Sequence, residues 1–283
     1  MKPNKKVRKI IAGILARYSE LLKIDIYAFI FLSNHYHLLI RALQGNADEF
    51  EENLNREIAR RINWVNHREG KFWARRYDDQ PVLNEDDLLE AFLYITTNPV
   101  RHGLVNDPAI WPGFSSYEMS ATEKPQSYSF EHYSAEEPQD RRTSHSLKIT
   151  PLPQFAGLSR KKRREKVLEL INERTKRLVE ERKANGQGFM NLEDILAQDP
   201  NDVPRSVSRS PRPHCYSKNP LVIKEYRRHV RDRRNKYIEA SARFRLGDLY
   251  AVFPEHSFKP PLHRKPRIER FKPLPDDFFK NAA

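Results

Sequence analysis

Two histidines stand two residues apart at the end of an apolar stretch. In residues 26–42, IYAFIFLSNHYHLLIRA, the apolar run ends in Ser-Asn, and His35 and His37 follow on either side of Tyr36. Side chains alternate along a strand, so both imidazoles would point to one face and the tyrosine to the other. Two imidazoles on one face can close on a single divalent ion. They can equally be ordinary histidines near a strand end, and the spacing alone leaves both interpretations open.

The segment YITTN could supply a third ligand and a reactive group. Tyr94 and Asn98 are four residues apart, so they share one face if the segment is helical. An amide oxygen is a suitable ligand for Mg²⁺ or Mn²⁺, and imidazole suits Mn²⁺. A phenol ordinarily ionises near pH ~10 and needs assistance to attack at neutral pH. Judged on the residues alone, a core aromatic and a polar residue before Pro99 explain the pair slightly better than a site does.

Elements of both types must position these side chains. Apolar residues spaced by three and four predict helices over residues 7–22, 48–65 and 84–98. Runs rich in β-branched and aromatic residues predict strands over residues 24–32, 35–42 and 71–83. Asn84 is suited to cap the third helix, and acidic residues follow it in the first turn.

The charge of the chain restricts its partners. The 283 residues contain 51 Lys and Arg against 38 Asp and Glu, a net charge of +13. This balance favours a polyanionic partner, with nucleic acid ahead of a membrane surface, although a basic surface without a partner gives the same count. The one cysteine, Cys215, excludes an internal disulfide and fits a reducing compartment. No apolar run approaches the ~20 residues of a membrane span.

The composition changes after residue 118. Residues 119–154 are rich in Ser, Thr, Glu, Pro and Gln, which predicts a linker between a first domain of residues 1–118 and the rest. Residues 155–283 are predicted to form a basic, mostly helical extension with a proline-rich tail. Helices are expected at 159–186, 191–198 and 219–247, and an apolar stripe on the last one comprises Val222, Tyr226, Val230, Tyr237 and Phe244. This extension is expected to bind DNA, with a merely solvated basic face as the alternative.

Four segments occur in a fixed order: NHYHLLI, then FWARRYDD with NEDDLL behind it, then YITTNPVRHGLV and WPGFSSYE. Through them, residues 5–118 resemble the single-tyrosine HUH transposases, in particular the branch associated with repetitive extragenic palindromes. LEDILAQDP, RSPRPHCY and GDLYAVFP are similar to the extension of longer members. The resemblance implies an α+β fold, a ferredoxin-like antiparallel sheet with helices, in a bacterial protein of the cytoplasm and nucleoid.

The resemblance also implies a reaction and a residue for each role. By position, His35 and His37 would hold Mg²⁺ or Mn²⁺, Asn98 would be the third ligand, and Tyr94 would be the nucleophile. Such enzymes cut and rejoin single-stranded DNA that carries hairpins. The tyrosine attacks a phosphorus, a 5′-phosphotyrosine bond forms, and a 3′-hydroxyl leaves. A rigid, buried strand positions a metal ligand better than a loop does, which explains histidines in an apolar segment.

Basic and aromatic residues around these positions are candidates for contacts with DNA. The proposed phosphate contacts are Arg56, Arg60, Arg61, Arg75, Arg76 and Arg101. Trp73, with Phe72 and Tyr77, could stack on unpaired bases. The alternatives are a solvated basic face for the arginines and an ordinary core position for Trp73.

The chain departs from the family pattern in several places. Ser33 stands where proline is usual, Tyr36 where an aliphatic residue is usual, and Ala74 where glutamine is usual. Family members also begin with a strand before the first helix, which would lie beside the histidine strand, and this chain begins almost at the helix. Either the true start lies upstream, or the copy is truncated and that strand is absent. Two functions are therefore considered: an active DNA strand transferase, or a truncated nucleic-acid-binding remnant without catalysis.

Overall fold

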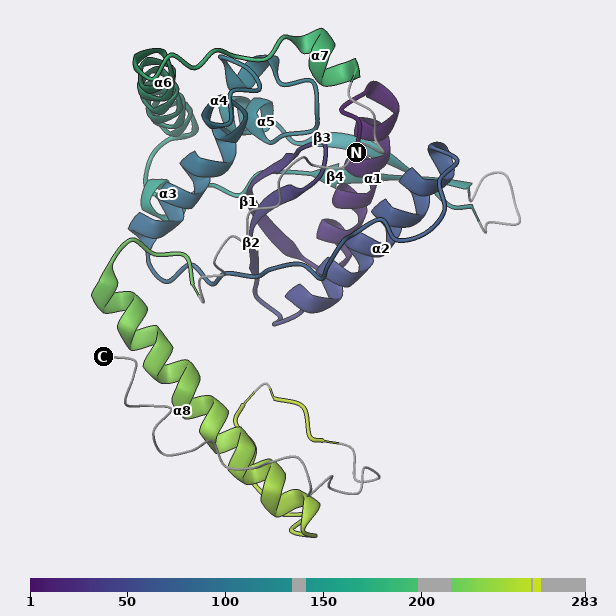
Figure 1. The fold of residues 1–283 in the computed structure, drawn as a ribbon, viewed down its shortest axis with the longest axis vertical. Coiled ribbons are helices and arrows are strands. Elements are labelled where there is room, and N and C mark those ends of the chain that lie inside the picture. Colours follow the sequence, from purple (N-terminus) through teal and green to yellow (C-terminus); the bar gives the residue numbers. More distant parts are fainter. Residues whose placement is uncertain (134–140, 198–214, 256, 261–283) are drawn as a thin grey trace. The chain divides into compact units, whose positions relative to one another are not determined.

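The structure is a computed structural model, shown in Figure 1. It describes residues 1–133, 141–197, 215–255 and 257–260. The chain divides into two compact units, Met1–Tyr216 and Ser217–Ala283. The predicted domain boundary at residue 118 therefore differs from the division in the structure, because later segments complete the core of the first unit.

Helix α1 (Lys5–Leu21) confirms the first predicted helix. It begins at Asn4, whose side-chain oxygen accepts a hydrogen bond from the backbone N–H of Val7 at 2.9 Å. One side of the helix is apolar and fully buried, which anchors it on the sheet. The buried apolar residues of α1 are Val7, Ile11, Ala12, Ile14, Leu15 and Ala16.

Two of the predicted strands form an antiparallel pair. Strand β1 (Ile24–Phe31) pairs with β2 (Tyr36–Ala42), and Ile30 lies opposite His37 in this register. His35, predicted as the first residue of the second strand, lies in the connection just before β2. The other edge of β1 is also bonded, since the N–H of Phe31 donates to the carbonyl of Phe114 at 2.8 Å. β1 is therefore an interior strand.

Helices and a hairpin cover both faces of this pair. Helix α2 (Ala47–Val65), together with α1, packs on the face that carries Tyr36, Leu38 and Ile40. Helix α3 (Glu85–Thr96) packs on the opposite face, where Leu39 is buried. As predicted, the side chain of Asn84 caps α3, by accepting from the N–H of Asp87 at 2.8 Å. The short helix α4 (Asn98–Arg101) continues directly from α3.

The third predicted strand, residues 71–83, is not a strand in the structure. Within this segment Val82 alone forms a bridge, to Tyr216, among the described residues. The segment is held by side chains instead, since the indole N–H of Trp73 donates to the backbone carbonyl of Asn55 on α2 at 3.0 Å. Most charged residues of this segment are exposed, so the segment would bury little apolar surface as a further strand of the sheet.

The predicted linker at residues 119–154 contains regular structure. It holds α5 (Tyr117–Thr122) and a hairpin of β3 (Gln126–Glu131) and β4 (Arg142–Leu147), which packs on α1. Two apolar residues of the hairpin, Phe130 and Leu147, are buried in the core below α1 and α2. The composition concealed these strands because polar residues occupy their outward positions. Two short 3₁₀ helices, η1 (Pro108–Ile110) and η3 (Pro153–Phe155), lie on either side.

Helix α6 (Arg160–Ala184) belongs to the first unit, although the sequence placed it in the extension. Val167, Ile171 and Leu178 are buried in the same cluster as α3 and α4. The short helix α7 (Leu192–Ala197) adds the buried Ile195 to that cluster. The prediction of a separate extension from residue 155 fails here because these three apolar side chains of α6 pack inward on the first unit.

The second unit consists of α8 (Pro220–Arg245) and the segment that follows it. The side chain of Asn219 caps this helix by accepting from the N–H of Leu221 at 2.9 Å. Of the predicted stripe, Phe244 is buried and packs edge-on against Phe253, with ring centroids 5.6 Å apart. The proline-rich tail after residue 260 lies outside the described residues.

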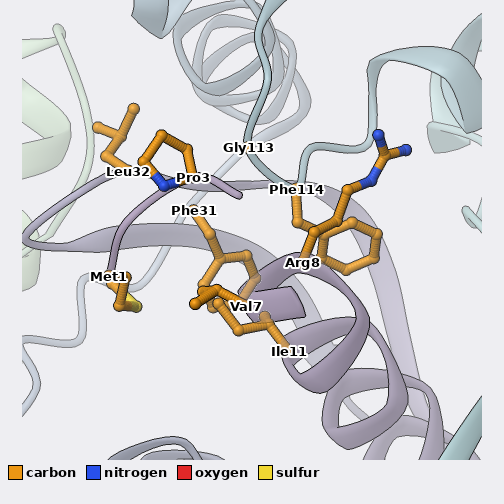
Figure 2. A pocket seen from close by; sticks show the side chains of 9 residues that line it. All are labelled: Met1, Pro3, Val7, Arg8, Ile11, Phe31, Leu32, Gly113 and Phe114. Carbon is orange, nitrogen blue, oxygen red and sulfur yellow. The ribbon is translucent and has the colours of Figure 1, made fainter. Parts of the chain in front are cut away.

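The mixture of helices with two antiparallel sheets confirms the α+β class. Among the described residues, no helix is long and apolar enough to cross a lipid bilayer. Figure 2 shows a small pocket between the start of α1 and the end of β1, lined by residues such as Val7, Ile11, Phe31 and Phe114. These side chains are apolar and lie on the α1 face of the sheet, away from the histidines, so the pocket carries no candidate chemistry.

Candidate active site

The two histidines and Tyr94 form one group between β2 and α3. The rings of His35 and His37 stand edge to face with centroids 5.0 Å apart. The rings of His37 and Tyr94 stand edge to face with centroids 5.5 Å apart. Tyr36 points to the opposite face, where its ring contacts Trp73, as the alternation of a strand predicts. The fold therefore brings together a pair of potential ligands and a potential nucleophile.

Each histidine offers a ring nitrogen to this group. The Nδ1 atom of His35 lies 2.6 Å from the side-chain oxygen of Asn34. An amide oxygen accepts hydrogen bonds, so this contact places the proton on Nδ1 and leaves the lone pair on Nε2. The Nε2 atom of His37 is buried and has no hydrogen-bond partner among the described residues. Both side chains can therefore bind an ion through Nε2.

Burial keeps these imidazoles neutral. Burial, with smaller contributions from the nearby His35 and His102, lowers the pKa of His37 from the ordinary value of 6.5 to about 4. Burial, followed by the charge of His102, also lowers the pKa of His35. A metal ligand must be the neutral imidazole, so both histidines are in the binding form at neutral pH. His102 was missed in the sequence, although it follows Asn98 by one helical turn.

Asn98 is fully buried, and neither its amide oxygen nor its amide nitrogen has a hydrogen-bond partner among the described residues. Leaving a buried polar group unsatisfied costs about 1–3 kcal/mol, which a bound ligand would offset. The part of the chain that is described contains no group of three or more His, Cys, Asp and Glu side chains that could hold a metal. A site for Mg²⁺ or Mn²⁺ thus depends on the Asn98 amide as third ligand, and the unsatisfied atoms fit that role.

Tyr94 projects from the last turn of α3, and a cation lies beside it. The guanidinium carbon of Arg101, on α4, is 5.6 Å from the centroid of the Tyr94 ring. α6 braces this region, because Arg182 donates to the backbone carbonyl of Arg101 at 3.2 Å. At the junction between α3 and α4, the hydroxyl of Thr97 donates to the carbonyl of Leu93 at 2.6 Å, which stabilises the end of α3.

The arginines proposed for phosphate contacts divide into three groups. Arg75, Arg76 and Arg101 are exposed, and Arg101 lies at the site itself. Arg56 and Arg60 are exposed on α2, but each is paired with an acid of the same helix: Arg56 with Glu52 at 3.5 Å and Arg60 with Glu57 at 3.0 Å.

Arg61 has a structural position and is not available to DNA. Arg61 is 3% exposed. Its Nε atom donates to the carboxylate of Glu57 at 2.8 Å, and its NH2 group donates to the backbone carbonyl of Glu131 at 2.7 Å. The guanidinium also lies over the ring of Phe130, 4.1 Å from the centroid. The prediction of a phosphate contact at Arg61 is wrong because this side chain joins α2 to the β3–β4 hairpin.

Trp73 is half-buried and tied to α2, which favours a packing role over base stacking. Its ring contacts Tyr36, with centroids 5.5 Å apart. The hydroxyl of Tyr36 donates to Glu51 at 2.6 Å, and burial raises the pKa of both groups. This cluster fixes the back of the histidine strand and the start of the segment that carries Arg75 and Arg76.

Comparison with known proteins adds one relationship. Over 102 residues the chain is 29% identical to a Haemophilus influenzae protein named REP-associated tyrosine transposase. This chain is a distant, partial relative of that transposase. The match covers 32% of this chain and 57% of the relative, so the chain spans little more than half the length of the relative. No family model matches the chain, and no solved structure matches it.

Proposed function

We propose that this protein is a metal-dependent, single-tyrosine DNA transposase that cuts and rejoins single-stranded DNA through a 5′-phosphotyrosine intermediate. The observation that carries the proposal is the packing of Tyr94 against His37. The buried, unsatisfied amide of Asn98, four residues after Tyr94, supports it. The relationship to a protein named as a tyrosine transposase supports it.

The metal site would consist of His35, His37 and Asn98. Its bound Mg²⁺ or Mn²⁺ would withdraw charge from the scissile phosphate and orient it for in-line attack. The protein supplies the rigidity: β2 is held by β1 along one edge, and α3 is packed against buried side chains of α6. His37 lies on β2 itself and His35 in the connection just before it, so the paired strand holds His37 directly and His35 through the adjoining residue.

Tyr94 performs the covalent step. Its phenol oxygen attacks the phosphorus, the bond between phosphorus and the 3′-oxygen breaks, and the 3′-hydroxyl leaves with a proton. The DNA 5′-phosphate is then joined to Tyr94. In the second step a 3′-hydroxyl attacks the phosphotyrosine and releases the phenol, so the phosphodiester is restored without an external energy source. The positive charge of Arg101 would stabilise the negative charge that develops on the phenol oxygen and the phosphate.

Exposed cations of the first unit would hold the DNA strand. Arg101 lies beside Tyr94, and the side chains of Arg75 and Arg76 are exposed on the segment before α3, where they could contact phosphates. Phosphate contacts position a strand without reading its bases, so they serve cleavage of an unpaired strand next to a hairpin. In this proposal the divalent metal is the cofactor, single-stranded DNA is the substrate, and bacterial DNA recombination is the process that the reaction serves.

The proposal is tested by incubating the full chain with end-labelled, hairpin-flanked single-stranded DNA and Mn²⁺, followed by denaturing electrophoresis. A labelled band at the mass of the protein, absent with EDTA, is the expected result, and mass spectrometry of the linked peptide should identify Tyr94. Binding of the same DNA without any adduct would instead support the inactive, DNA-binding remnant.

A further inference from the structure

We propose that α8 carries a second nucleic-acid site, a basic face made of Lys224, Arg227, Arg231 and Arg234 that binds the phosphodiester backbone. It lies in the second unit, outside the proposed active site, and goes beyond the proposed function. Figure 1 shows α8 as one continuous helix.

The basic face and the acidic residues of α8 lie on different sides of the helix. The four residues of the basic face are spaced by three, four and three positions, which places them within about 80° of one another. They extend for about 15 Å along the helix. Glu225, Asp232 and Glu239 are spaced by seven and lie on a separate stripe, about a third of a turn away. No acid interrupts the basic face.

The basic face has no counter-charge among the described residues. Its four side chains are exposed, and none of them forms an ion pair with a described residue. Like charges three and four residues apart repel each other, so this arrangement destabilises the helix on its own. A bound polyanion would remove the repulsion.

Several other cations of α8 already have partners. Arg228 pairs with Glu225 at 3.8 Å, Arg243 pairs with Asp248 at 2.6 Å, and Arg233 donates to the backbone carbonyl of Glu255. The apolar stripe of the helix packs on Phe253 through Tyr237 and Phe244. Among the described residues, neither the acids of α8 nor the segment that packs on its apolar stripe covers the basic face.

Helix α6 shows that a high content of Arg and Lys does not by itself indicate a binding face. Its basic residues serve the first unit: Arg163 pairs with Glu123 at 2.8 Å and Arg174 with Glu90 at 3.5 Å. Others pair along the helix, such as Lys166 with Glu169 at 2.9 Å. The two basic helices predicted to bind DNA are therefore distinguished by their contacts, and α8 alone of the two carries a cation row without partners among the described residues.

The row fits a nucleic-acid backbone better than an acidic protein surface. A DNA duplex presents one phosphate charge per ~1.7 Å of its axis, so a rigid line of about 15 Å can meet several phosphates at once. Each phosphate contact releases a counterion, which steepens the decrease of affinity with salt. A duplex and a single strand share this chemistry and differ in the slope per contact, about 0.9 against about 0.7.

The test compares two variants of the full chain with equal loss of charge. The face variant is K224Q/R227Q/R231Q/R234Q, and the control variant is R228Q/R233Q/K236Q/R243Q, whose residues lie elsewhere on α8. Binding of a labelled 30-nucleotide duplex and of the same-length single strand is measured with EDTA present, between 50 and 300 mM salt. Circular dichroism checks that both variants keep the helix content of the parent.

The face variant is expected to lose about two to four units of slope, with roughly tenfold or greater loss of affinity at 100 mM salt, while the control variant loses at most about one unit. If the face variant loses more affinity for the duplex, the duplex is the ligand, and if it loses more for the single strand, the single strand is the ligand. Equal effects of both variants, or none from the face variant, would overturn the proposal. So would binding to anionic lipid vesicles, but not DNA, that depends on the face. A Tyr94→Phe chain should give the same slopes, so failure here is separate from failure of the proposed function.

Discussion

The imidazole of His37 stands edge-on to the ring of Tyr94, with ring centroids 5.5 Å apart and planes at 84°. This contact joins β2 to α3 and places a residue that can hold an ion beside one that can attack a phosphorus. The residues around it explain its rigidity, because β2 is paired with β1 and α3 is packed on α6.

Replacing both histidines tests the metal site. His35→Ala/His37→Ala should remove Mn²⁺-dependent cleavage and Mn²⁺ binding, because the two imidazoles supply two of the three protein ligands. DNA affinity should be largely retained, since phosphate contacts come from arginines. Calorimetry measures the Mn²⁺ binding. The matched control is His67→Ala/His229→Ala, which changes two exposed histidines. Equal Mn²⁺ binding by the double variant and the control would locate the metal elsewhere.

Arg101 is expected to assist the covalent step. Arg101→Gln removes the cation beside Tyr94 and should slow adduct formation about 10- to 100-fold, the value of one charge-assisted contact. Arg101→Lys should recover part of the rate because it restores the charge. The rate is followed by quenched time points on denaturing gels. A normal rate in Arg101→Gln, alongside Arg142→Gln as an exposed control, contradicts this role.

Arg61 is expected to affect stability and not DNA binding. Arg61→Ala leaves Glu57 buried without its closest partner, which should cost about 3–5 kcal/mol of unfolding free energy. Arg75→Ala/Arg76→Ala should leave stability within about 0.5 kcal/mol and weaken DNA binding, because both side chains are exposed. Urea unfolding and DNA titration of the variants separate the two roles. A stable Arg61→Ala chain with weakened DNA binding would reverse the assignment.

The histidine pair also predicts how stability depends on pH. The pKa of His37 falls from 6.5 to about 4 on folding, so between these values the unfolded chain binds more protons than the folded one. Stability of the metal-free protein should therefore decrease as the pH falls from about 6.5 to about 4, by up to about 3 kcal/mol from this residue. His37→Gln should have a flatter profile in urea unfolding with EDTA. An unchanged profile would show that His37 is as accessible to protons as in the unfolded chain.

The sequence was sufficient for the elements that hold the site. The two strands of the pair, the alternation around Tyr36 and the Asn84 cap are local features, and each is present in the structure. The relation of Tyr94 to His37 was inferred from family resemblance, because no local rule joins a strand to a helix that follows much later in the chain.

Long-range packing explains what sequence reasoning missed. Polar residues on the outer face of β3 and β4 hid Phe130 and Leu147, which become core only when the hairpin meets α1. Arg61 looked like a surface cation until Glu57 and the carbonyl of Glu131 enclosed it. α6 looked like part of an extension because its charges outnumber the buried residues Val167, Ile171 and Leu178 that join it to α3.

The central claim is that Tyr94 forms the covalent bond to DNA, and one substitution tests it most directly. The full chain, Tyr94→Phe and Tyr77→Phe are incubated with labelled, hairpin-flanked single-stranded DNA and Mn²⁺, and the covalent adduct is quantified on denaturing gels. Tyr77 is partly exposed near Arg76, and Tyr36 is already bonded to Glu51 on the opposite face of the strand. The account predicts an adduct with the parent chain and with Tyr77→Phe, and none with Tyr94→Phe. An adduct that persists in Tyr94→Phe would contradict it.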